Sequence, residues 1–365
     1  MAPLRILTAS NVDSILSTLS PQLALASQAS VLTAFSRPTP STSSPVQIQT
    51  PHRVTISSEG STMLFMPSRA PTSSDTTTQT TTTTTTTTTA CKIVSVPSAG
   101  GSEGLPASTI VMDEKSGQVK ALINARRLTA LRNACGSALF LSLFPTPQPP
   151  ARLLIFGTGA QALSHSTLFL RLYPSLSRAT FIIRSSTSRS TALQAELRAL
   201  FPEVTITLAT HSSASSSGLD ELVGQADIIV TTTSSTVPLF NSSPTSPIPK
   251  EGARVILIGS YKPSMHEVDG DLVRRSGIVV DSKEACMREA GELIDAKVGE
   301  DEMVELGEAF GDETVRQRVV QKSSGEDGVI LFKSVGLGIQ DVSIAKLVLD
   351  EAERRDIGCI VDDYD

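Results

Sequence analysis

The sequence predicts an α/β protein in which a Rossmann-type, doubly wound parallel sheet is inserted into a discontinuous α+β domain. One reason is that the apolar run at residues 151–156 leads directly into a glycine turn from Gly157 to Ala162. A second is that short apolar runs alternate with helical segments after this turn, which is typical of a parallel sheet with helices on both faces. A third is the length of 365 residues, because one compact core rarely supports so long a chain.

The glycine turn has the spacing of a loop that holds a dinucleotide. Gly157 permits the tight turn, Gly159 lets the backbone approach a pyrophosphate, and Ala162 allows close packing of helix on strand. The first amides of the helix predicted at residues 160–173 would face the charge of the pyrophosphate. An ordinary strand-to-helix turn can have the same pattern, so the interpretation depends on its context. The expected cofactor contacts are Gly157, Thr158, Gly159, Ala160, Gln161 and Ala162.

The composition argues against several classes of function. A net charge of −6, an aromatic fraction of 4% and the lack of Trp leave no basic surface or stacking platform for nucleic acid. The four Cys and four His residues have no metal-ligand spacing, so neither zinc nor a disulfide framework is expected. Asn11 and Asp13 interrupt any signal-type apolar segment, and no run approaches the roughly 20 apolar residues of a membrane span. We therefore expect a cytoplasmic protein.

Before the glycine turn the pattern is one of helices and hairpins. The expected elements are a helix from a capping box at Ser10 to about Leu19, a strand pair at 53–56 and 61–65, a strand at 91–96, a hairpin of 109–112 with 119–123, and a helix at 126–144. The threonine tract at residues 76–89 has no apolar residues with which to bury a face, so a surface loop is expected there. A proline cluster at 145–150 marks the boundary between domains.

After the turn, strands and helices alternate. Strands are expected at residues 179–183, 204–208, 226–230, 254–258 and 277–280, with helices near 191–200 and between 283 and 318. The charged run at 300–308 predicts a solvated helix face. A strand at 329–332 and a helix at 341–355 lie outside the doubly wound unit and return to the first domain. The predicted domains are residues 1–149 with 320–365, and residues 150–319.

Six segments together resemble the ornithine cyclodeaminase and mu-crystallin family. They occur in the family's order and are residues 66–67, 128–134, 157–162, 231–238, 259–263 with Glu267, and 331–336 with 340–341. The resemblance implies a homodimeric enzyme with a substrate and dimerisation domain and a nicotinamide-binding domain. Members transfer a hydride to or from the carbon that bears an amine or imine. Their activities include making proline from ornithine, reducing cyclic ketimines, and dehydrogenating alanine-like or opine-like substrates.

The resemblance also implies where substrate binds. An amino or imino acid has a carboxylate, which a planar Arg fork can hold with two charge-assisted hydrogen bonds. Arg132 matches the family's substrate arginine, and Arg53 and Lys92 match two further substrate contacts. Lys92 lies in an apolar strand, where an unpaired ammonium would be costly. Val335, with Gly336 after it, matches a segment that borders the substrate.

Two departures from the family pattern argue against deamination of ornithine. Tyr261 occupies the position of an aspartate that handles the proton and water of deamination in cyclodeaminases. A tyrosine can donate a proton, but with a pKa near 10 it is a poor base at neutral pH. Leu64 occupies the position of a glutamate that recognises the distal amine of ornithine. Both changes favour a reductase acting on an apolar or cyclic imino acid.

The end of the second strand predicts the cofactor. A carboxylate at this place would bind the ribose hydroxyls of NAD, whereas an arginine favours the 2′-phosphate of NADP. The strand ends at Arg184 and Ser185 with no acid, so NADP is expected, with NAD as the alternative. A later loop is expected to line the cofactor at the same sheet edge through Thr231, Thr232, Thr233 and Ser234.

The leading hypothesis is an NADP-preferring oxidoreductase that reduces the carbon–nitrogen double bond of a cyclic imino acid. Lys92 and Tyr261 are the expected catalytic groups, with Tyr261 or a bound water supplying a proton. Two alternatives stay open, a true cyclodeaminase and a crystallin-like protein that binds NADPH without turnover. His165 and His266 are expected to be surface or turn histidines, and Glu267 is expected to fix the loop that carries Tyr261.

Overall fold

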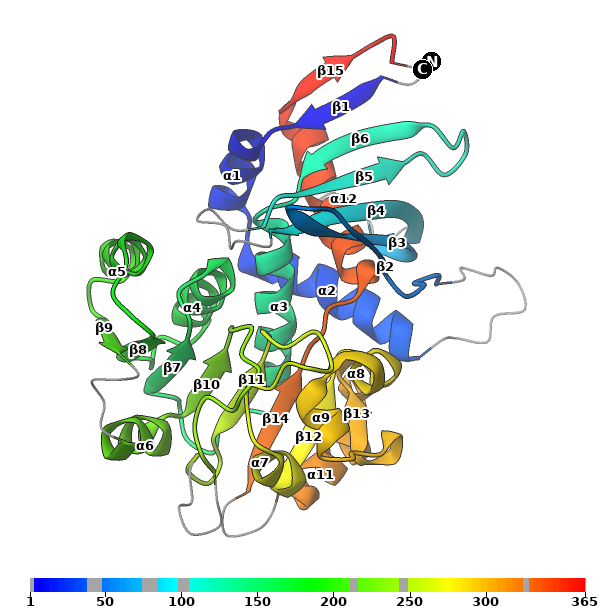
Figure 1. The fold of residues 1–365 in the computed structure, drawn as a ribbon. Helices are drawn as coiled ribbons and strands as arrows, with labels where there is room; N and C mark the ends of the chain where they lie inside the picture. The colour runs from blue at the N-terminus through cyan, green and yellow to red at the C-terminus, as the bar shows by residue number, and fades with distance from the viewer. Residues whose placement is uncertain are drawn as a thin grey trace. The chain divides into compact units, whose positions relative to one another are not determined.

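The computed structural model describes residues 3–37, 48–73, 85–97, 105–210, 216–242, 249–323 and 328–364. The chain forms two compact units (Figure 1). Unit 1 contains residues 1–132 and 336–365, and unit 2 contains residues 133–335. Each unit is built on one sheet, of seven strands in unit 1 and eight in unit 2. An α/β fold with a discontinuous first domain is therefore confirmed.

The sheet of unit 2 is parallel throughout, with strand order β13-β12-β14-β11-β10-β7-β8-β9. Its strands are β7 (Arg152–Phe156), β8 (Arg178–Ile183), β9 (Thr205–Thr210), β10 (Ile228–Thr231), β11 (Arg254–Leu257), β12 (Ser276–Val280), β13 (Met303–Glu305) and β14 (Val329–Lys333). Every residue of β10 and β11 is buried. Such continuous burial is expected of parallel strands that helices cover on both faces, and it explains why these runs are apolar without alternation.

Helix α3 (Leu128–Leu143) precedes β7, and the other helices of unit 2 connect the parallel strands. They are α4 (Ala160–Leu172), α5 (Ser188–Leu200), α6 (Ser216–Gln225), α7 (Gly270–Arg275), α8 (Lys283–Glu289), α9 (Gly291–Asp295), α10 (Leu306–Ala309) and α11 (Glu313–Lys322), with a 3₁₀ turn η1 (Glu300–Glu302). Strand β14 corrects one expectation. The sequence assigned residues 329–332 to the first domain, but β14 pairs with β11 and β12 in the middle of the parallel sheet.

The charged run at 300–308 is also not the continuous solvated helix that was expected. It contains η1, the strand β13 and the start of α10. Met303 and Val304 are buried in β13, which pairs with β12 at the edge of the sheet. The acidic residues around these two apolar positions obscured a strand only three residues long.

Unit 1 has a mixed sheet with strand order β15-β1-β6-β5-β4-β3-β2. Its strands are β1 (Leu4–Leu7), β2 (Val54–Ser57), β3 (Ser61–Ser73), β4 (Thr85–Pro97), β5 (Ala107–Met112), β6 (Val119–Asn124) and β15 (Cys359–Val361). The β2–β3 and β5–β6 hairpins are as predicted. The short strands β1 and β15 were not predicted. They pair with each other near the two ends of the chain (Figure 1).

Three helices pack on one face of this sheet. They are α1 (Ala9–Thr18), α2 (Pro21–Ser36) and α12 (Gly338–Arg355), of which α12 contacts β3, β4 and β5. The cap of α1 differs from the prediction, because Thr8 and not Ser10 is the N-cap residue. Thr8 and Asn11 form the reciprocal capping box. The predicted pattern was therefore shifted by two residues along the chain.

The end of the threonine tract is strand rather than loop. Thr85 to Thr89 belong to β4 and pair with residues 69–73 of β3. Thr72 and Thr88 are buried, and their hydroxyls lie 2.9 Å apart. The predicted loop was wrong here because a paired strand and covering helices supply what the tract lacks by itself, and threonine suits such a surface. The rest of the tract, through residue 84, lies outside the described residues.

Candidate active site

The glycine turn joins β7 to α4 at the carboxyl edge of the parallel sheet. Gly157 has a φ of +108°, and a Cβ atom there would lie 2.6 Å from Thr232 Oγ1. Only glycine fits such a position without strain. Gly159 is the N-cap residue of α4 and makes no side-chain cap, and no atom lies within 4 Å of where its Cβ would be. Open space in front of uncapped helix amides fits a pyrophosphate.

Glu267 ties together two loops at this sheet edge. Its Oε1 accepts from the amide of Thr233, at 2.8 Å, and its Oε2 accepts from the amide of Gly259, at 2.7 Å, and from that of Ser260. A Cβ at Gly259 would lie only 2.0 Å from the carbonyl oxygen of Thr233, so the two loops touch backbone to backbone. The expectation that Glu267 fixes the Tyr261 loop is confirmed. The same bonds also hold the loop from Thr231 to Ser234.

A second buried group lies behind the Tyr261 loop, and we call Lys333, Glu292, Glu267 and Ser260 the Lys333 cluster. Lys333 Nζ donates to the carbonyl oxygen of Ser260 at 2.6 Å and lies 3.1 Å from Glu292 Oε1. Ser260 Oγ donates to Glu292 at 2.7 Å. All four residues are at most 1% exposed. The sequence analysis missed Lys333 and Glu292, although a lysine ending an apolar strand was a usable signal.

Burial raises the pKa of Glu267 above its usual value, with Lys333 opposing that change. The carboxyl group nevertheless accepts several hydrogen bonds from neutral donors. Buried charges tolerate the loss of water when such bonds replace it. The Lys333 cluster is therefore a structural support for the sheet edge.

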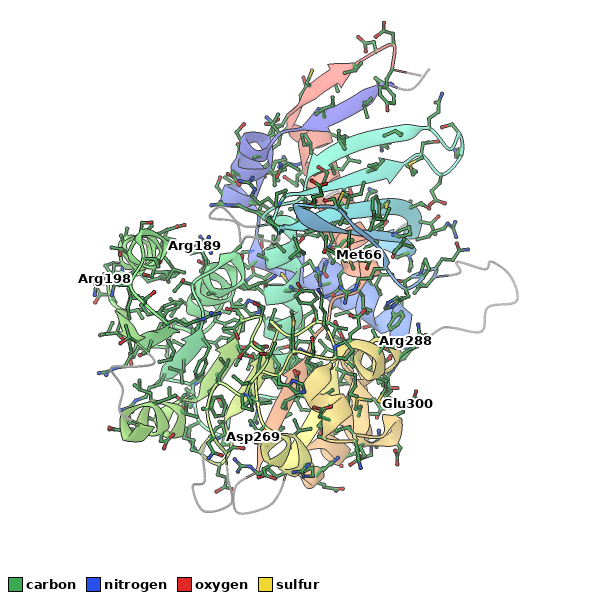
Figure 2. All side chains as sticks on the ribbon, viewed as in Figure 1. Met66, Arg189, Arg198, Asp269, Arg288 and Glu300 are labelled. Atoms are coloured by element: carbon green, nitrogen blue, oxygen red, sulfur yellow. The ribbon has the colours of Figure 1, made fainter. Side chains whose placement is uncertain are left out.

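The end of β8 has the residues that were predicted to select the cofactor. Arg184 and Ser185 follow β8 and are exposed. Thr187 caps α5 with a reciprocal capping box. Arg189 and Arg198 are on α5 (Figure 2), and Arg198 donates to the carbonyl oxygen of Ile206, which gives it a structural role. The sequence from Ile183 to Thr187 contains no acidic residue.

Unit 1 contains a cationic cluster, which we define as the buried residues Lys92, Arg132 and Asp341 with the half-buried Arg53. Lys92 Nζ lies 2.7 Å from Asp341 Oδ2, and Arg132 Nε donates to Asp341 Oδ1 at 3.2 Å. Arg132 also donates from Nη1 to Gln340 Oε1 at 3.1 Å. Lys92, Arg132 and Asp341 are each about 3% exposed or less. The structure thus brings together three cations that the sequence identified separately, while Tyr261 and Val335 belong to unit 2.

Burial lowers the pKa of Lys92 to about 8, with Arg132 and Arg53 acting in the same direction and Asp341 opposing them. A desolvated ammonium is disfavoured, and nearby positive charge disfavours it further. Lys92 can therefore both hold and release a proton near neutral pH, which is the property expected of a general acid or base.

The local fold explains why these side chains meet. Lys92 is opposite Met66 of β3 and Thr109 of β5, on the sheet face that α12 covers. Gly336 has a φ of +88°, and a Cβ there would lie 2.7 Å from both terminal nitrogens of Arg132, so its backbone packs on the guanidinium. Leu64 is on the same sheet face as Met66 and is 8% exposed.

His165 and His266 differ in their burial. His165 was expected at the surface but is fully buried in α4, where its Nδ1 donates to the carbonyl oxygen of Gln161 at 2.8 Å. Ser137 Oγ lies 2.9 Å from its Nε2. Burial lowers the pKa of His165 to about 4, so it is a neutral core residue. His266 lies partly exposed beside Asp295, at 2.8 Å. The expectation was therefore wrong for His165, because its imidazole is buried beside Ser137 of α3 and Phe169 of α4.

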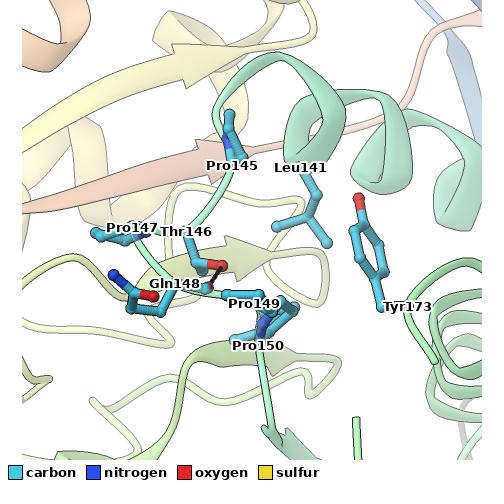
Figure 3. A pocket seen from close by; sticks show the side chains of 9 residues that line it. Leu141, Pro145, Thr146, Pro147, Gln148, Pro149, Pro150 and Tyr173 are labelled. Atoms are coloured by element: carbon cyan, nitrogen blue, oxygen red, sulfur yellow. Dashed lines mark hydrogen bonds between the residues drawn. The ribbon is translucent and has the colours of Figure 1, made fainter. Parts of the chain in front are cut away.

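The proline cluster lines a cavity of about 270 Å³ (Figure 3). Its walls include Leu141, Tyr173 and Ile228, the first residue of β10. The cavity therefore lies at the amino edge of the parallel sheet, whereas cofactors of such sheets bind at the carboxyl edge. It contains none of the predicted site residues.

Within the described residues, no helix combines the length and apolar character needed to cross a membrane. The same part of the chain contains no group of three or more His, Cys, Asp or Glu side chains that could hold a metal ion.

The fold and the glycine turn define a two-domain protein of the dinucleotide-binding class. The model of the ornithine cyclodeaminase/mu-crystallin family matches residues 41–356, and the chain belongs to this family. It is 28% identical to the ketimine reductase mu-crystallin of Mus musculus over 247 residues, which cover 67% of this chain and 69% of that protein.

Two solved structures share the fold. The Δ¹-pyrroline-2-carboxylate reductase of Thermococcus litoralis, solved with NADH and L-proline, has a TM-score of 0.76 and 22% identity, covering 97% of this chain and 99% of its own. An archaeal alanine dehydrogenase dimer with bound NAD has a TM-score of 0.75 and 18% identity, covering 99% of this chain and all of its own.

Proposed function

We propose that this protein is an NADP-preferring reductase that transfers a hydride to the carbon–nitrogen double bond of a cyclic imino acid carboxylate. The observation that carries the proposal is the cationic cluster, in which three cations and one carboxylate give a net charge of +2. Such a buried excess of positive charge suits a ligand with a carboxylate. The relative from Mus musculus, a ketimine reductase by name, supports the reaction type.

Arg132 would hold the substrate carboxylate. Its Nε and Nη1 are fixed by Asp341 and Gln340, and the backbone of Gly336 lies beside its two terminal nitrogens. A guanidinium held in this way has little freedom left to lose when it binds a planar anion. Arg53 adds positive charge beside Lys92. Val335 precedes Gly336 and would border the substrate ring.

Lys92 would supply the proton that the substrate nitrogen gains on reduction. Positive charge from Arg53 and Arg132 disfavours binding of an iminium that is already protonated. The neutral imine is the better ligand, and its proton is then best provided within the site. A lysine with a pKa of about 8 is a suitable donor at neutral pH. Tyr261 is a second candidate donor, although a hydroxyl with an ordinary pKa near 10 is a weaker acid.

The residues of unit 2 fit a nicotinamide dinucleotide, which when bound would supply the hydride. The turn from Gly157 to Ala162 would hold the pyrophosphate, and the loop from Thr231 to Ser234 would lie along the same edge. Arg184 and Ser185 would contact the 2′-phosphate of NADP. The two structural neighbours were solved with NADH or NAD, so the preference for NADP rests on Arg184 and on the lack of an acid there.

Two observations disfavour ornithine as the substrate. Leu64 lies on the same face of β3 as Met66, the residue opposite Lys92, so the position near the cationic cluster where a carboxylate could hold a distal amine is apolar. Tyr261 replaces the aspartate of the deamination step. A cyclodeaminase and a binding protein without turnover remain the competing functions, and the experiment below separates them.

We also propose that the protein is a homodimer that pairs through the sheet of unit 1. The face opposite α12 has apolar residues that are partly or fully exposed, namely Met63, Phe65, Ile93, Ile110 and Leu122. Val54 and Ile56 on β2 are at least 50% exposed. An apolar area of this kind is characteristic of an interface. Light scattering should give twice the mass of the 38.5 kDa chain, and a monomer would refute this part.

The experiment is a substrate panel with NADPH and NADH in parallel. We expect Δ¹-pyrroline-2-carboxylate or Δ¹-piperideine-2-carboxylate to oxidise NADPH faster than NADH, and the Arg132→Met variant to lose this activity. Release of ammonia from ornithine with catalytic cofactor would instead establish a cyclodeaminase. Tight NADPH binding without turnover of any imine would establish a binding protein. Either result would refute the proposed reductase.

A further inference from the structure

We propose that Asp341 is a positioning residue that holds Lys92 and Arg132 at a fixed separation and keeps the buried Lys92 ammonium charged. This inference rests on the proposed function, in which Lys92 supplies a proton and Arg132 binds a carboxylate. Asp341 would not touch the substrate. Its role would be to set the protonation state of Lys92 and the positions of Lys92 and Arg132, the two residues that would contact the substrate.

The geometry gives each oxygen of Asp341 a different partner. Oδ2 lies 2.7 Å from Lys92 Nζ, and Oδ1 accepts from Arg132 Nε at 3.2 Å. The two cations reach the carboxylate from different elements, β4 and α3, so a single side chain fixes their mutual distance. With Asp341 3% exposed, water cannot replace it as a screen between them.

The start of α12 holds Asp341 in place. Asp341 is in the first turn of this helix, where the positive end of the helix dipole stabilises a carboxylate. Gly338 packs so closely on β3 that a Cβ there would lie 2.1 Å from Ser68 Oγ. Gln340 Oε1 accepts from the amide of Leu337 at 3.3 Å as well as from Arg132. The turn can therefore neither slide along the sheet nor rotate freely.

The electrostatic balance shows what Asp341 does for Lys92. The charged groups that face Lys92 are Asp341 from α12, Arg132 from α3 and Arg53 from the segment before β2. Burial and both arginines disfavour the ammonium, and among these groups Asp341 is the one that favours it. Without Asp341, the pKa of Lys92 would fall further below its present value of about 8, and Lys92 would lose its proton at neutral pH.

The test compares Asp341→Asn with wild-type protein by a measurement that needs no turnover. Protein enriched in ¹³C at the lysine side chains is titrated by NMR, and the Lys92→Met variant identifies the Lys92 signal. We expect the Lys92 titration to move to clearly lower pH in Asp341→Asn, and to stay near the wild-type position in Asp341→Glu. Asp350→Asn is the matched control, since Asp350 pairs with Lys346 on the same helix, and it should leave the Lys92 signal unchanged.

A Lys92 titration that is the same in Asp341→Asn and wild type would overturn the proposal. If Asp341→Asn does not fold, the double variant Lys92→Met/Asp341→Asn is tested for recovery of a cooperative urea transition. Removing both partners costs less than leaving one buried charge, so the double variant should fold and unfold cooperatively in urea, and a double variant that also fails to fold would overturn the proposal. Where the imine is turned over, the proposal also predicts a higher KM and a kcat limb shifted to lower pH. A protein without turnover would refute the proposed reductase but leave the NMR result standing.

Discussion

The cationic cluster of unit 1 and the Lys333 cluster of unit 2 differ in how their charge is compensated. In the Lys333 cluster the carboxylate of Glu267 accepts hydrogen bonds from neutral backbone and hydroxyl donors, and the ammonium of Lys333 donates to Ser260. In the cationic cluster Asp341 pairs with two cations, Lys92 and Arg132, and the net charge is +2. The Lys333 cluster has one cation and two carboxylates and relies on neutral donors for its further hydrogen bonds, while the cationic cluster has an excess of positive charge that a carboxylate ligand would balance.

The difference teaches that burial of charge does not by itself indicate function. A buried ion pair often adds no more stability than apolar residues of similar volume would. Removing one partner is nevertheless costly, because it leaves an uncompensated buried charge. The Lys333 cluster should therefore affect mainly stability. The cationic cluster should affect mainly turnover, because its charge excess is present before any ligand binds.

The largest effect is expected for Lys92→Met. It removes the proposed proton donor, so kcat/KM for the imine should fall about 100- to 10,000-fold, with a much smaller change in the urea midpoint. Lys120→Met is the control, because Lys120 is on β6 of the same sheet but is 38% exposed and pairs with Glu353. If Lys92→Met kept the wild-type kcat/KM, the claim that the cationic cluster acts in turnover would be refuted.

Lys333→Met should have the opposite profile. It leaves Glu292 and Glu267 buried without the ammonium, so the free energy of unfolding should drop by about 3–5 kcal/mol. Urea unfolding followed by circular dichroism measures this. Lys283→Met breaks the partly exposed pair with Glu308, at 2.8 Å, and should cost only about 0–1 kcal/mol. Equal losses in the two variants would show that the Lys333 cluster is no more structural than a surface pair.

His165 provides a neutral buried group for comparison. Its folded pKa of about 4 lies below the ordinary value of 6.5, so the unfolded chain binds the extra proton between these pH values. Stability should then rise from pH 4 to 6.5 by about 3 kcal/mol through this residue. The slope should be smaller in His165→Phe, measured as urea midpoint against pH. An unchanged slope would mean that another group causes the acid sensitivity.

The smallest effect is expected for Arg132→Lys. Lysine keeps the charge but lacks the planar fork, so about 1.5–3 kcal/mol of charge-assisted hydrogen bonding to the carboxylate would be lost. KM for the imine should rise about 10- to 100-fold while kcat changes less. A change in kcat alone would show that Arg132 acts on the reacting atoms and not on the carboxylate.

The sequence predicted most of unit 2 because most of its strands are local apolar runs bounded by clear helix signals, whereas the three-residue β13 lies within a charged run and was missed. Lys92, Arg132 and the glycine turn were also found from the sequence, two of them through the family resemblance. Lys333 and Asp341 were missed as functional partners, because their significance comes from residues 73 and 209 positions away in the chain. The same is true of Thr85 to Thr89, whose strand exists because of the partner β3. The local sequence pattern does not reveal pairing between residues that are so far apart in the chain.

The most direct test of the central claim is the pH dependence of kcat with NADPH and the preferred imine. If the protonated Lys92 of the cationic cluster supplies the proton, activity should be lost as pH rises through about 8, and this limb should be absent from the residual activity of Lys92→Met. A profile in which Lys92→Met keeps the same limb as the wild type would contradict the account.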